Sequence, residues 1–271
     1  MAYISGNSAA FFAFNIWDTE SARAVIDAGE AMGRDVILQT SSAIFAMLEK
    51  DVFCAWLRAY ISHKSINAYL HLDHCRDKSL ICQAVDFGWD SVMFDGSQLD
   101  LAENISITNE IVQYAHARGC LVEAEVGYIG KALANSKQAE IMIASREDID
   151  YFLQNTDVDL FAAAFGTAHG LYKGKPVLHY ELIDYIHEIS DVPFVVHGGT
   201  GLSDEAFKEL LWHENVKKIN ISTDVKQAYR EAVTEAWHLG YFLRDGFEAA
   251  RIEKMIYESI VRMAKGKLAL L

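Results

Sequence analysis

The chain has 271 residues, of which 51% are hydrophobic and 23% charged, proportions typical of a well-packed soluble domain. The formal net charge of −14 argues against nucleic acid and anionic membranes as partners, because both need basic patches. It leaves a phosphorylated substrate open, since backbone N–H groups bind phosphate whatever the overall charge. No apolar run reaches the about 20 residues that span a bilayer. The N-terminus lacks the features of a signal peptide, and the four cysteines have no CxxC spacing, so we expect a cytoplasmic protein.

Eight short apolar runs alternate with helical patterns along the chain. Several runs are continuously apolar, as expected for parallel strands covered on both faces. The predicted strands are Phe11–Asn15, Asp35–Ser41, Ile66–His74, Ser91–Gly96, Leu121–Val126, Leu160–Gly166, Pro193–Gly198 and Lys217–Thr223. The clearest helices between them are Glu20–Met32, Ser79–Phe87, Ile105–Arg118 and Asp204–Trp212, with Ser203 as the N-cap of the last.

Eight strand–helix units in an undivided chain predict one α/β domain over residues 1–271, a (β/α)₈ TIM barrel. The alternative, an open doubly wound sheet, lacks support because no GxGxxG follows the first strand. The stretch from Asp224 to the end is helical in pattern and longer than one barrel helix. We therefore expect extra C-terminal helices, part of which packs under the barrel or against another subunit.

Polar side chains gather at the carboxyl ends of the predicted strands, where TIM-barrel active sites lie. Polar residues scattered at random would not all fall at the same end of the strands, so their position at the carboxyl ends predicts a site at the mouth of the barrel. The residues are Asn15, Ser41, Asp73, His74, Asp95, Glu123, Glu125, His169, His197, Asn220, Ser222 and Thr223.

Three histidines among these residues, His74, His169 and His197, point to a metal site. Neutral imidazole is a common zinc ligand, and three protein ligands plus one open position make a catalytic zinc site. A single histidine beside an apolar run is more often a core residue, but three at equivalent strand ends favour a metal. Asp73, next to His74, is a candidate general acid/base, because Asp77 is the better candidate for capping the following helix.

Glycine-rich turns at residues 197–201 and 169–173 predict a phosphate site, because glycine lets the backbone approach an anion at a helix N-terminus. The loops after strands seven and eight often bind phosphate in this fold. A Schiff-base lysine is disfavoured, since Lys217 and Lys218 open the eighth strand at the wrong end for the mouth. His71 is expected to be structural, and Cys75 to pack in the core.

Several motifs together resemble the class II, metal-dependent ketose-bisphosphate aldolases, most nearly the tagatose-bisphosphate and shorter fructose-bisphosphate aldolases. The resemblance extends from Ala13-Phe-Asn15 to Asn220-Ile-Ser-Thr-Asp224. Its specific parts are His-Leu-Asp73-His74, Ser91-Val-Met-Phe-Asp95-Gly-Ser97, Val-Glu123-Ala-Glu125-Val-Gly127, Phe-Gly-Thr-Ala-His169-Gly170-Leu-Tyr and Val-His197-Gly-Gly-Thr-Gly-Leu.

The resemblance implies reversible cleavage of a ketose phosphate or bisphosphate to dihydroxyacetone phosphate and an aldehyde through a metal-stabilised enediolate. It implies Zn²⁺ on His74, His169 and His197, with Asp73 as the acid/base. It also implies a homodimer or homotetramer, and it raises the expectation of a monovalent cation, Na⁺ or K⁺. Further residues implied are Glu125 as an alternate metal ligand, Asp95 near it, Asn15 near the mouth, Asn220 on a substrate hydroxyl, and Ser41, Gly170, Lys173, Gly198, Thr200, Ser222 and Thr223 around the phosphate.

The segment 130–140 departs from the family, because Glu140 is its only acid and two lysines precede it. Glu140 is the candidate for proton transfer, and Arg244 for the far-end phosphate, although no proline precedes Arg244. Ser222 stands where fructose-bisphosphate-specific members carry aspartate. Two alternatives stay open: a different acidic ketose phosphate as substrate, and a non-catalytic metal-binding homologue. A metal-dependent hydrolase is disfavoured, since residues 15–17 replace the usual His-x-His.

Overall fold

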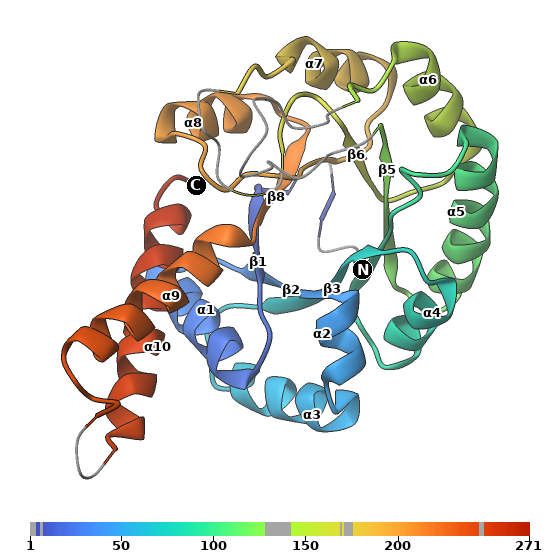
Figure 1. Cartoon of the computed structure of the whole chain (residues 1–271). Helices are drawn as coiled ribbons and strands as arrows, with labels where there is room; N and C mark the ends of the chain where they lie inside the picture. The colour runs from blue at the N-terminus through green and yellow to red at the C-terminus, as the bar shows by residue number, and fades with distance from the viewer. Residues whose placement is uncertain (1–3, 6–7, 128–141, 169, 171–175, 244–246) are drawn as a thin grey trace.

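Eight parallel strands form a closed barrel in a computed structural model that describes residues 4–5, 8–127, 142–168, 170, 176–243 and 247–271. Each strand pairs with its neighbour in the sequence, and β1 closes the barrel by pairing with β8, for example Phe12 with Ile219. The predicted TIM barrel is therefore confirmed (Figure 1). The strands are β1 Phe11–Asn15, β2 Val36–Ser41, β3 Ala68–Cys75, β4 Ser91–Phe94, β5 Leu121–Val126, β6 Leu160–Ala163, β7 Phe194–Val196 and β8 Val216–Ile221.

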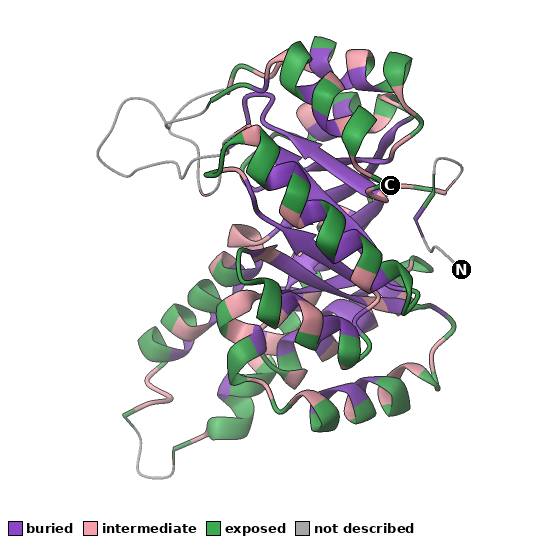
Figure 2. Ribbon diagram, turned by 90° about the vertical axis from the view of Figure 1, so that its right-hand side faces the viewer, coloured by how far each residue is buried: buried purple, intermediate pink, exposed green. Residues whose placement is uncertain are grey.

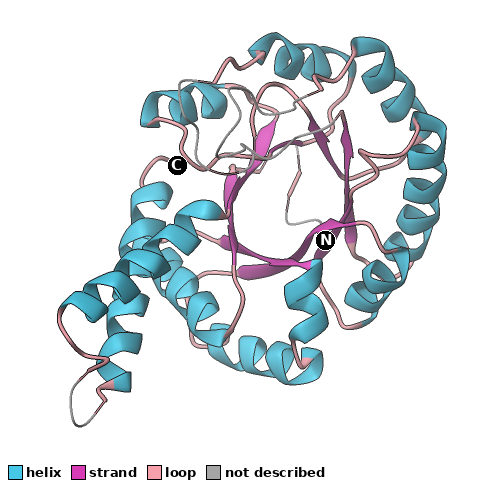
Figure 3. Cartoon of the chain, in the orientation of Figure 1, coloured by secondary structure: helices cyan, strands magenta, loops and turns pink. Residues whose placement is uncertain are grey.

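Helices surround the strands as an outer ring (Figure 3). The predicted cap and stop residues lie at the helix ends where they were expected. Ser203 Oγ accepts from the backbone N–H of Ala206 at the start of α8, and Gly33 ends α1 with a left-handed φ of 63°. The helices that precede β8 are α1 Thr19–Met32, α2 Ser42–Met47, α3 Lys50–Ile61, α4 Lys78–Asp86, α5 Leu101–His116, α6 Arg146–Asn155, α7 Tyr180–Ile189 and α8 Asp204–Trp212.

Four strands end earlier than the sequence predicts. β4, β6, β7 and β8 stop at Phe94, Ala163, Val196 and Ile221, two or three residues before the expected ends. At two of these ends the glycine that closes the predicted run has a positive φ, 114° at Gly166 and 69° at Gly198, which is incompatible with an extended strand. The residues after these two strands therefore belong to loops at the barrel mouth.

The barrel interior is divided between an apolar and a polar end. Alternation along each strand sends every second side chain inward. The inward apolar side chains form a cluster of Ile4, Phe11, Ala13, Ile37, Leu160, Ala162 and Val195. Further along the same inward faces the side chains become polar, and all of the strands are buried between this interior and the helices (Figure 2). The polar end of the interior is thus the floor of the predicted site.

Two helices follow β8: α9 Thr223–His238 completes the eighth strand–helix unit, and α10 Ala249–Leu268 continues beyond it, which confirms the predicted C-terminal extension. The buried face of α10 includes Ile252, Ile256 and Ile260, and Tyr257 Oη donates to Asp27 Oδ2 of α1 at 2.7 Å. The helix packs beside α1 and α9 on the outer face of the barrel, not beneath it (Figure 1). Within the described ranges, no helix is long and apolar enough to cross a membrane.

Candidate active site

The end of β3 turns two adjacent side chains toward the barrel mouth. His74 has a φ of 48°, the left-handed region that a β-branched or bulky residue rarely adopts, and the β3–β4 register shifts between Leu72 and Cys75. A regular strand would send Asp73 and His74 to opposite faces. The local kink is a strained conformation of the kind found at functional sites, and it brings both side chains to one pocket.

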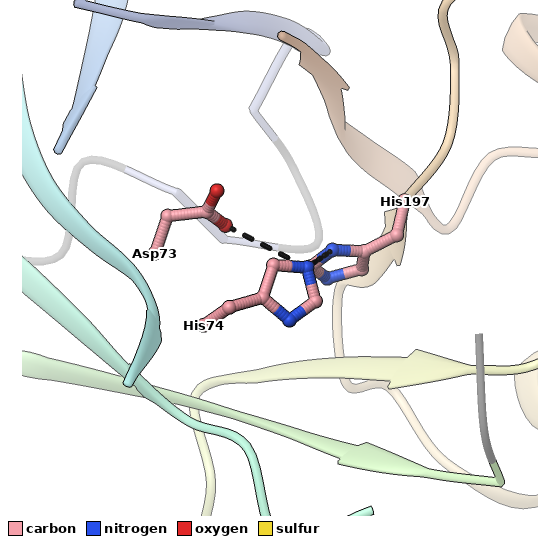
Figure 4. A group of neighbouring side chains, drawn as sticks. All are labelled: Asp73, His74 and His197. Carbon is pink, nitrogen blue, oxygen red and sulfur yellow. Dashed lines mark hydrogen bonds and ion pairs between the residues drawn. The ribbon is translucent and has the colours of Figure 1, made fainter. Parts of the chain in front are cut away.

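Asp73, His74 and His197 form a compact group of metal donors (Figure 4). Their donor atoms lie within 4.8 Å of one another, and His74 Nε2 is 2.8 Å from His197 Nδ1. Imidazole nitrogens are ligand atoms that Zn²⁺ accepts, so the two histidines fit this ion, and the Asp73 carboxylate lies beside them. The third predicted ligand, His169, lies outside the described residues.

The carboxylate of Asp73 is held by two amides, one on each oxygen. Asn15 Nδ2 donates to Oδ2 at 3.2 Å, and Asn220 Nδ2 donates to Oδ1 at 3.3 Å. Gln39 Nε2 in turn donates to Asn15 Oδ1 at 3.1 Å. Burial alone raises the pKa of Asp73, but the charges of His74, Lys218 and His197 and the Asn15 hydrogen bond outweigh it and lower the pKa below its usual value. At neutral pH the group is a carboxylate, ready to accept a proton.

His74 is oriented from its other side by Asp95. His74 Nδ1 is 3.7 Å from Asp95 Oδ2, which also accepts from Arg76 Nε and Nη2 at 2.9 and 2.8 Å. Burial lowers the pKa of His74, but Asp73, Asp95 and Glu125 outweigh burial and raise it to about 9. Burial likewise opposes ionisation of Asp95, yet its hydrogen bonds from His74 and Ser97 bring its pKa well below the usual range. A carboxylate behind a ligand histidine fixes the ring, as in many metal sites.

His197 is oriented by a second carboxylate, Glu123, from inside the barrel. His197 Nε2 is 2.9 Å from Glu123 Oε1, and Lys218 Nζ donates to Glu123 Oε2 at 2.7 Å. The amine of Lys218 lies in the interior against Glu123 and His71. Lys218 is the third residue of β8 and does not line the cavity, in agreement with the prediction that it lies away from the mouth. His71, expected to be structural, belongs to this polar cluster.

A cavity of about 770 Å³ opens over these groups, within the size range of small-ligand sites. It gathers side chains from strands at all sides of the barrel. The predicted residues that line it are Asn15, Ser41, Asp73, His74, Asp95, Glu125, Gly170, Gly198, Thr200, Asn220, Ser222 and Thr223. Four predicted residues, Glu140, His169, Lys173 and Arg244, lie outside the described residues.

The turn after β7 meets the start of α9 at one side of the cavity. Gly198 has a φ of 69°, and a Cβ there would lie 2.6 Å from Ala168 O, so only glycine fits. Thr200 Oγ1 accepts from the backbone N–H of Asp224 at 3.4 Å, which ties the turn to the first turn of α9. Lys226 of α9 also lines the cavity. Backbone donors, hydroxyls and a cation therefore converge here.

Sequence reasoning did not predict four residues that line the cavity: Arg76, Ser97, Gln98 and Lys226. The sequence could have indicated Arg76 and Lys226, because each is a cation within the first few residues after a predicted strand end. No such signal marks Gln98. Cys75 behaves as predicted: its side chain is buried in the core around the barrel, away from His74.

The comparisons with known proteins agree with this geometry. The family model described as fructose-bisphosphate aldolase class-II matches residues 1–271.

This chain belongs to the class-II fructose-bisphosphate aldolase family.

Solved structures are similar along nearly the whole chain. The YdjI aldolase from Escherichia coli is 27% identical, with a TM-score of 0.80, over 97% of this chain and 91% of that one. The fructose-bisphosphate aldolase from Campylobacter jejuni, 21% identical with a TM-score of 0.78 over 97% and 90%, shares the fold. The chain is thus an aldolase, a carbon–carbon lyase of a zinc-dependent family acting on ketose phosphates.

Proposed function

We propose that this aldolase cleaves a ketose phosphate reversibly to dihydroxyacetone phosphate and an aldehyde. The observation that carries the proposal is the convergence of His74 Nε2 and His197 Nδ1, 2.8 Å apart, beside an ionised Asp73 at the floor of the cavity. His74, His197 and His169 would hold Zn²⁺, with Glu125 as an alternate ligand. When bound, Zn²⁺ supplies Lewis-acid polarisation of the substrate ketone and stabilisation of the enediolate.

Asp73 acts as the base in the cleavage direction. Its ionised carboxylate, held by Asn15 and Asn220, takes the proton from the hydroxyl beside the bond that breaks, and it returns this proton in condensation. Asn220 supports this placement, because its Oδ1 is buried and has no hydrogen-bond partner among the described residues. That oxygen can accept from a substrate hydroxyl next to Asp73.

The phosphate of the three-carbon product is proposed to bind where the β7 turn meets α9. Gly198 and Thr200 on the turn and Ser222 and Thr223 at the start of α9 line this side, with Lys226 as a cation. The first backbone N–H groups of a helix and its dipole favour an anion. Ser41 and Gly170 complete the proposed contacts, together with Lys173.

Proton exchange on the enediolate is proposed for Glu140, and the far-end phosphate for Arg244. Both proposals rest on the family resemblance alone. Replacing Glu140 by alanine should abolish exchange of the dihydroxyacetone phosphate methylene proton with deuterated solvent, measured by NMR. Full exchange in that variant would remove Glu140 from the mechanism.

A substrate panel tests the proposed function. The zinc-loaded protein is offered fructose and tagatose bisphosphates and ketose monophosphates with acidic far ends, and the triose phosphate formed is measured. Preference for the bisphosphates supports the ordinary family reaction, whereas preference for the acidic monophosphates supports the alternative substrate. Zinc binding without cleavage of any of these compounds would contradict catalysis and favour a metal-binding homologue.

We further propose a cytoplasmic homodimer or homotetramer with Na⁺ or K⁺ as an additional cofactor. The four cysteines are unpaired, three of them buried, which fits a reducing compartment. Exposed apolar side chains at the ends of α8 and α9, Trp212 and Trp237, are candidates for subunit contact. Size-exclusion chromatography with light scattering would measure the subunit number.

A further inference from the structure

An ion pair lies inside the barrel beneath the two histidines. Lys218 of β8, Glu123 of β5 and His71 of β3 are all fully buried, and they come from three strands that are not neighbours. Lys218 Nζ contacts Glu123 Oε2 at 2.7 Å and His71 Nε2 at 3.1 Å. A buried ion pair often gives no more stability than well-packed apolar side chains of similar volume. The pair therefore calls for an explanation other than stability.

The donors and acceptors of this cluster allow one arrangement of protons. An ammonium group only donates, so Nε2 of His71 accepts, and Nδ1 of His71 carries a proton toward Ser91 Oγ at 2.8 Å. This makes His71 neutral, in agreement with a pKa lowered by burial and by Lys218. Glu123 only accepts, with Lys218 on Oε2 and His197 Nε2 on Oε1 at 2.9 Å.

The proton of His197 is consequently fixed on Nε2. Its other nitrogen, Nδ1, then carries the lone pair and faces His74 Nε2 at 2.8 Å. If the proton sat on Nδ1, His197 could not serve as a metal ligand through that atom. Asn220 Nδ2, 3.2 Å from Nδ1, also needs an acceptor there, so the interior ion pair and this amide favour the same tautomer from opposite sides of the ring.

We propose that Glu123 and Lys218 are positioning residues that lock His197 in the tautomer needed for zinc binding. Glu123 Oε1 accepts the Nε2 proton, and Lys218 donates to Oε2, which keeps the carboxylate pointed at the ring. This inference rests on the proposed zinc site, since it explains how one of its ligands is prepared. Removal of such an outer carboxylate typically weakens metal binding 10- to 100-fold.

The substitution Glu123→Gln gives a sharp test. Lys218 needs the single amide oxygen of the new side chain, so the amide NH₂ must face His197 Nε2 and drive the proton to Nδ1. We expect zinc affinity, measured by competition with a chromophoric chelator, to fall at least about tenfold. Nitrogen-15 NMR of the zinc-free protein should show the His197 proton on Nδ1 in place of Nε2.

Two charge-neutral double variants separate orientation from charge. In Glu123→Gln with Lys218→Met, the amide is free to rotate and present its oxygen to His197, so zinc affinity should return to near the wild-type value. In Glu123→Leu with Lys218→Met, no acceptor remains, and the affinity should stay about tenfold or more below wild type. Lys217→Met is the matched control, because Lys217 neighbours Lys218 but donates to Ser8 O, away from the site.

The outcomes are distinct. If the wild-type protein binds no zinc, the proposed function itself fails. If wild type binds zinc and Glu123→Gln retains both its affinity and the Nε2 proton, the positioning role is wrong. Should the single variant fail to fold by circular dichroism, the two double variants decide, since equal zinc affinities in them would overturn the role of Glu123 as an acceptor.

Discussion

Replacing Asp73 by asparagine should separate carbon–carbon cleavage from metal binding. The amide has nearly the shape of the carboxylate but cannot accept the substrate proton. A positioned general base contributes about 10²- to 10⁴-fold, so kcat for cleavage should fall by that factor, about 3–5 kcal/mol in activation free energy. The lost hydrogen bond to Asn15 or Asn220 should cost about 1 kcal/mol of folding stability.

The same variant should bind zinc at least as well as wild type at pH 7. Asp73 raises the pKa of His74, so its neutralisation lets His74 lose its proton more readily and removes a competitor of the metal. This expectation distinguishes a base from a ligand. A third metal ligand would give the opposite result, a large loss of zinc affinity.

The assay follows cleavage by coupling dihydroxyacetone phosphate to its reduction by NADH, with zinc content measured in parallel. Proton exchange of dihydroxyacetone phosphate with deuterated solvent should persist, because enediolate formation does not require Asp73. Asp77→Asn is the control, since Asp77 caps α4 through Ser79 N and lies off the cavity. A loss of kcat below tenfold, or zinc affinity weakened more than tenfold, would refute the reasoning.

Three further outcomes are expected. Dialysis against a chelator should abolish cleavage and lower Tm, and added Zn²⁺ should restore both. Cleavage activity that survives complete metal removal would contradict a metal-dependent reaction. Zinc binding at pH 7 should release about one proton, because the pKa of His74 is about 9, and this release should vanish well above pH 9. Calorimetry in buffers of different ionisation enthalpy measures the number of protons released. A number that does not change with pH would contradict this expectation. Gly198→Ala should lower Tm by roughly 3–8 °C and raise KM for the phosphorylated substrate. Gly33→Ala is the control, because Gly33 also has a positive φ of 63° but nothing lies within 4 Å of an added Cβ, so KM should not change. Equal KM values in the two variants would argue against a phosphate contact at Gly198.

The order of the eight strands and the face on which polar residues gather follow from local signals. Continuous apolar runs that alternate with helices predict a closed parallel barrel. Because the strands are parallel, the residues at their carboxyl ends, such as Asn15, Asp73 and Asn220, lie at the same mouth of the barrel. Caps such as Ser203 and stop signals such as Gly33 fix element ends locally, so these predictions were accurate.

The ends of β4, β6, β7 and β8 and the interior contacts depend on atoms far apart in the sequence. The sequence alone could not show that Asp73 and His74 face one pocket, because this requires the left-handed φ of His74 and the register shift against β4. Nor could it reveal Lys218 as the partner of Glu123, 95 residues away, since barrel closure sets how deep each strand residue lies. Sequence by itself determined the fold and the residue types at the mouth. Tertiary structure decided which nitrogen, oxygen and charge face each other, because those contacts join strands that only the closed barrel brings together.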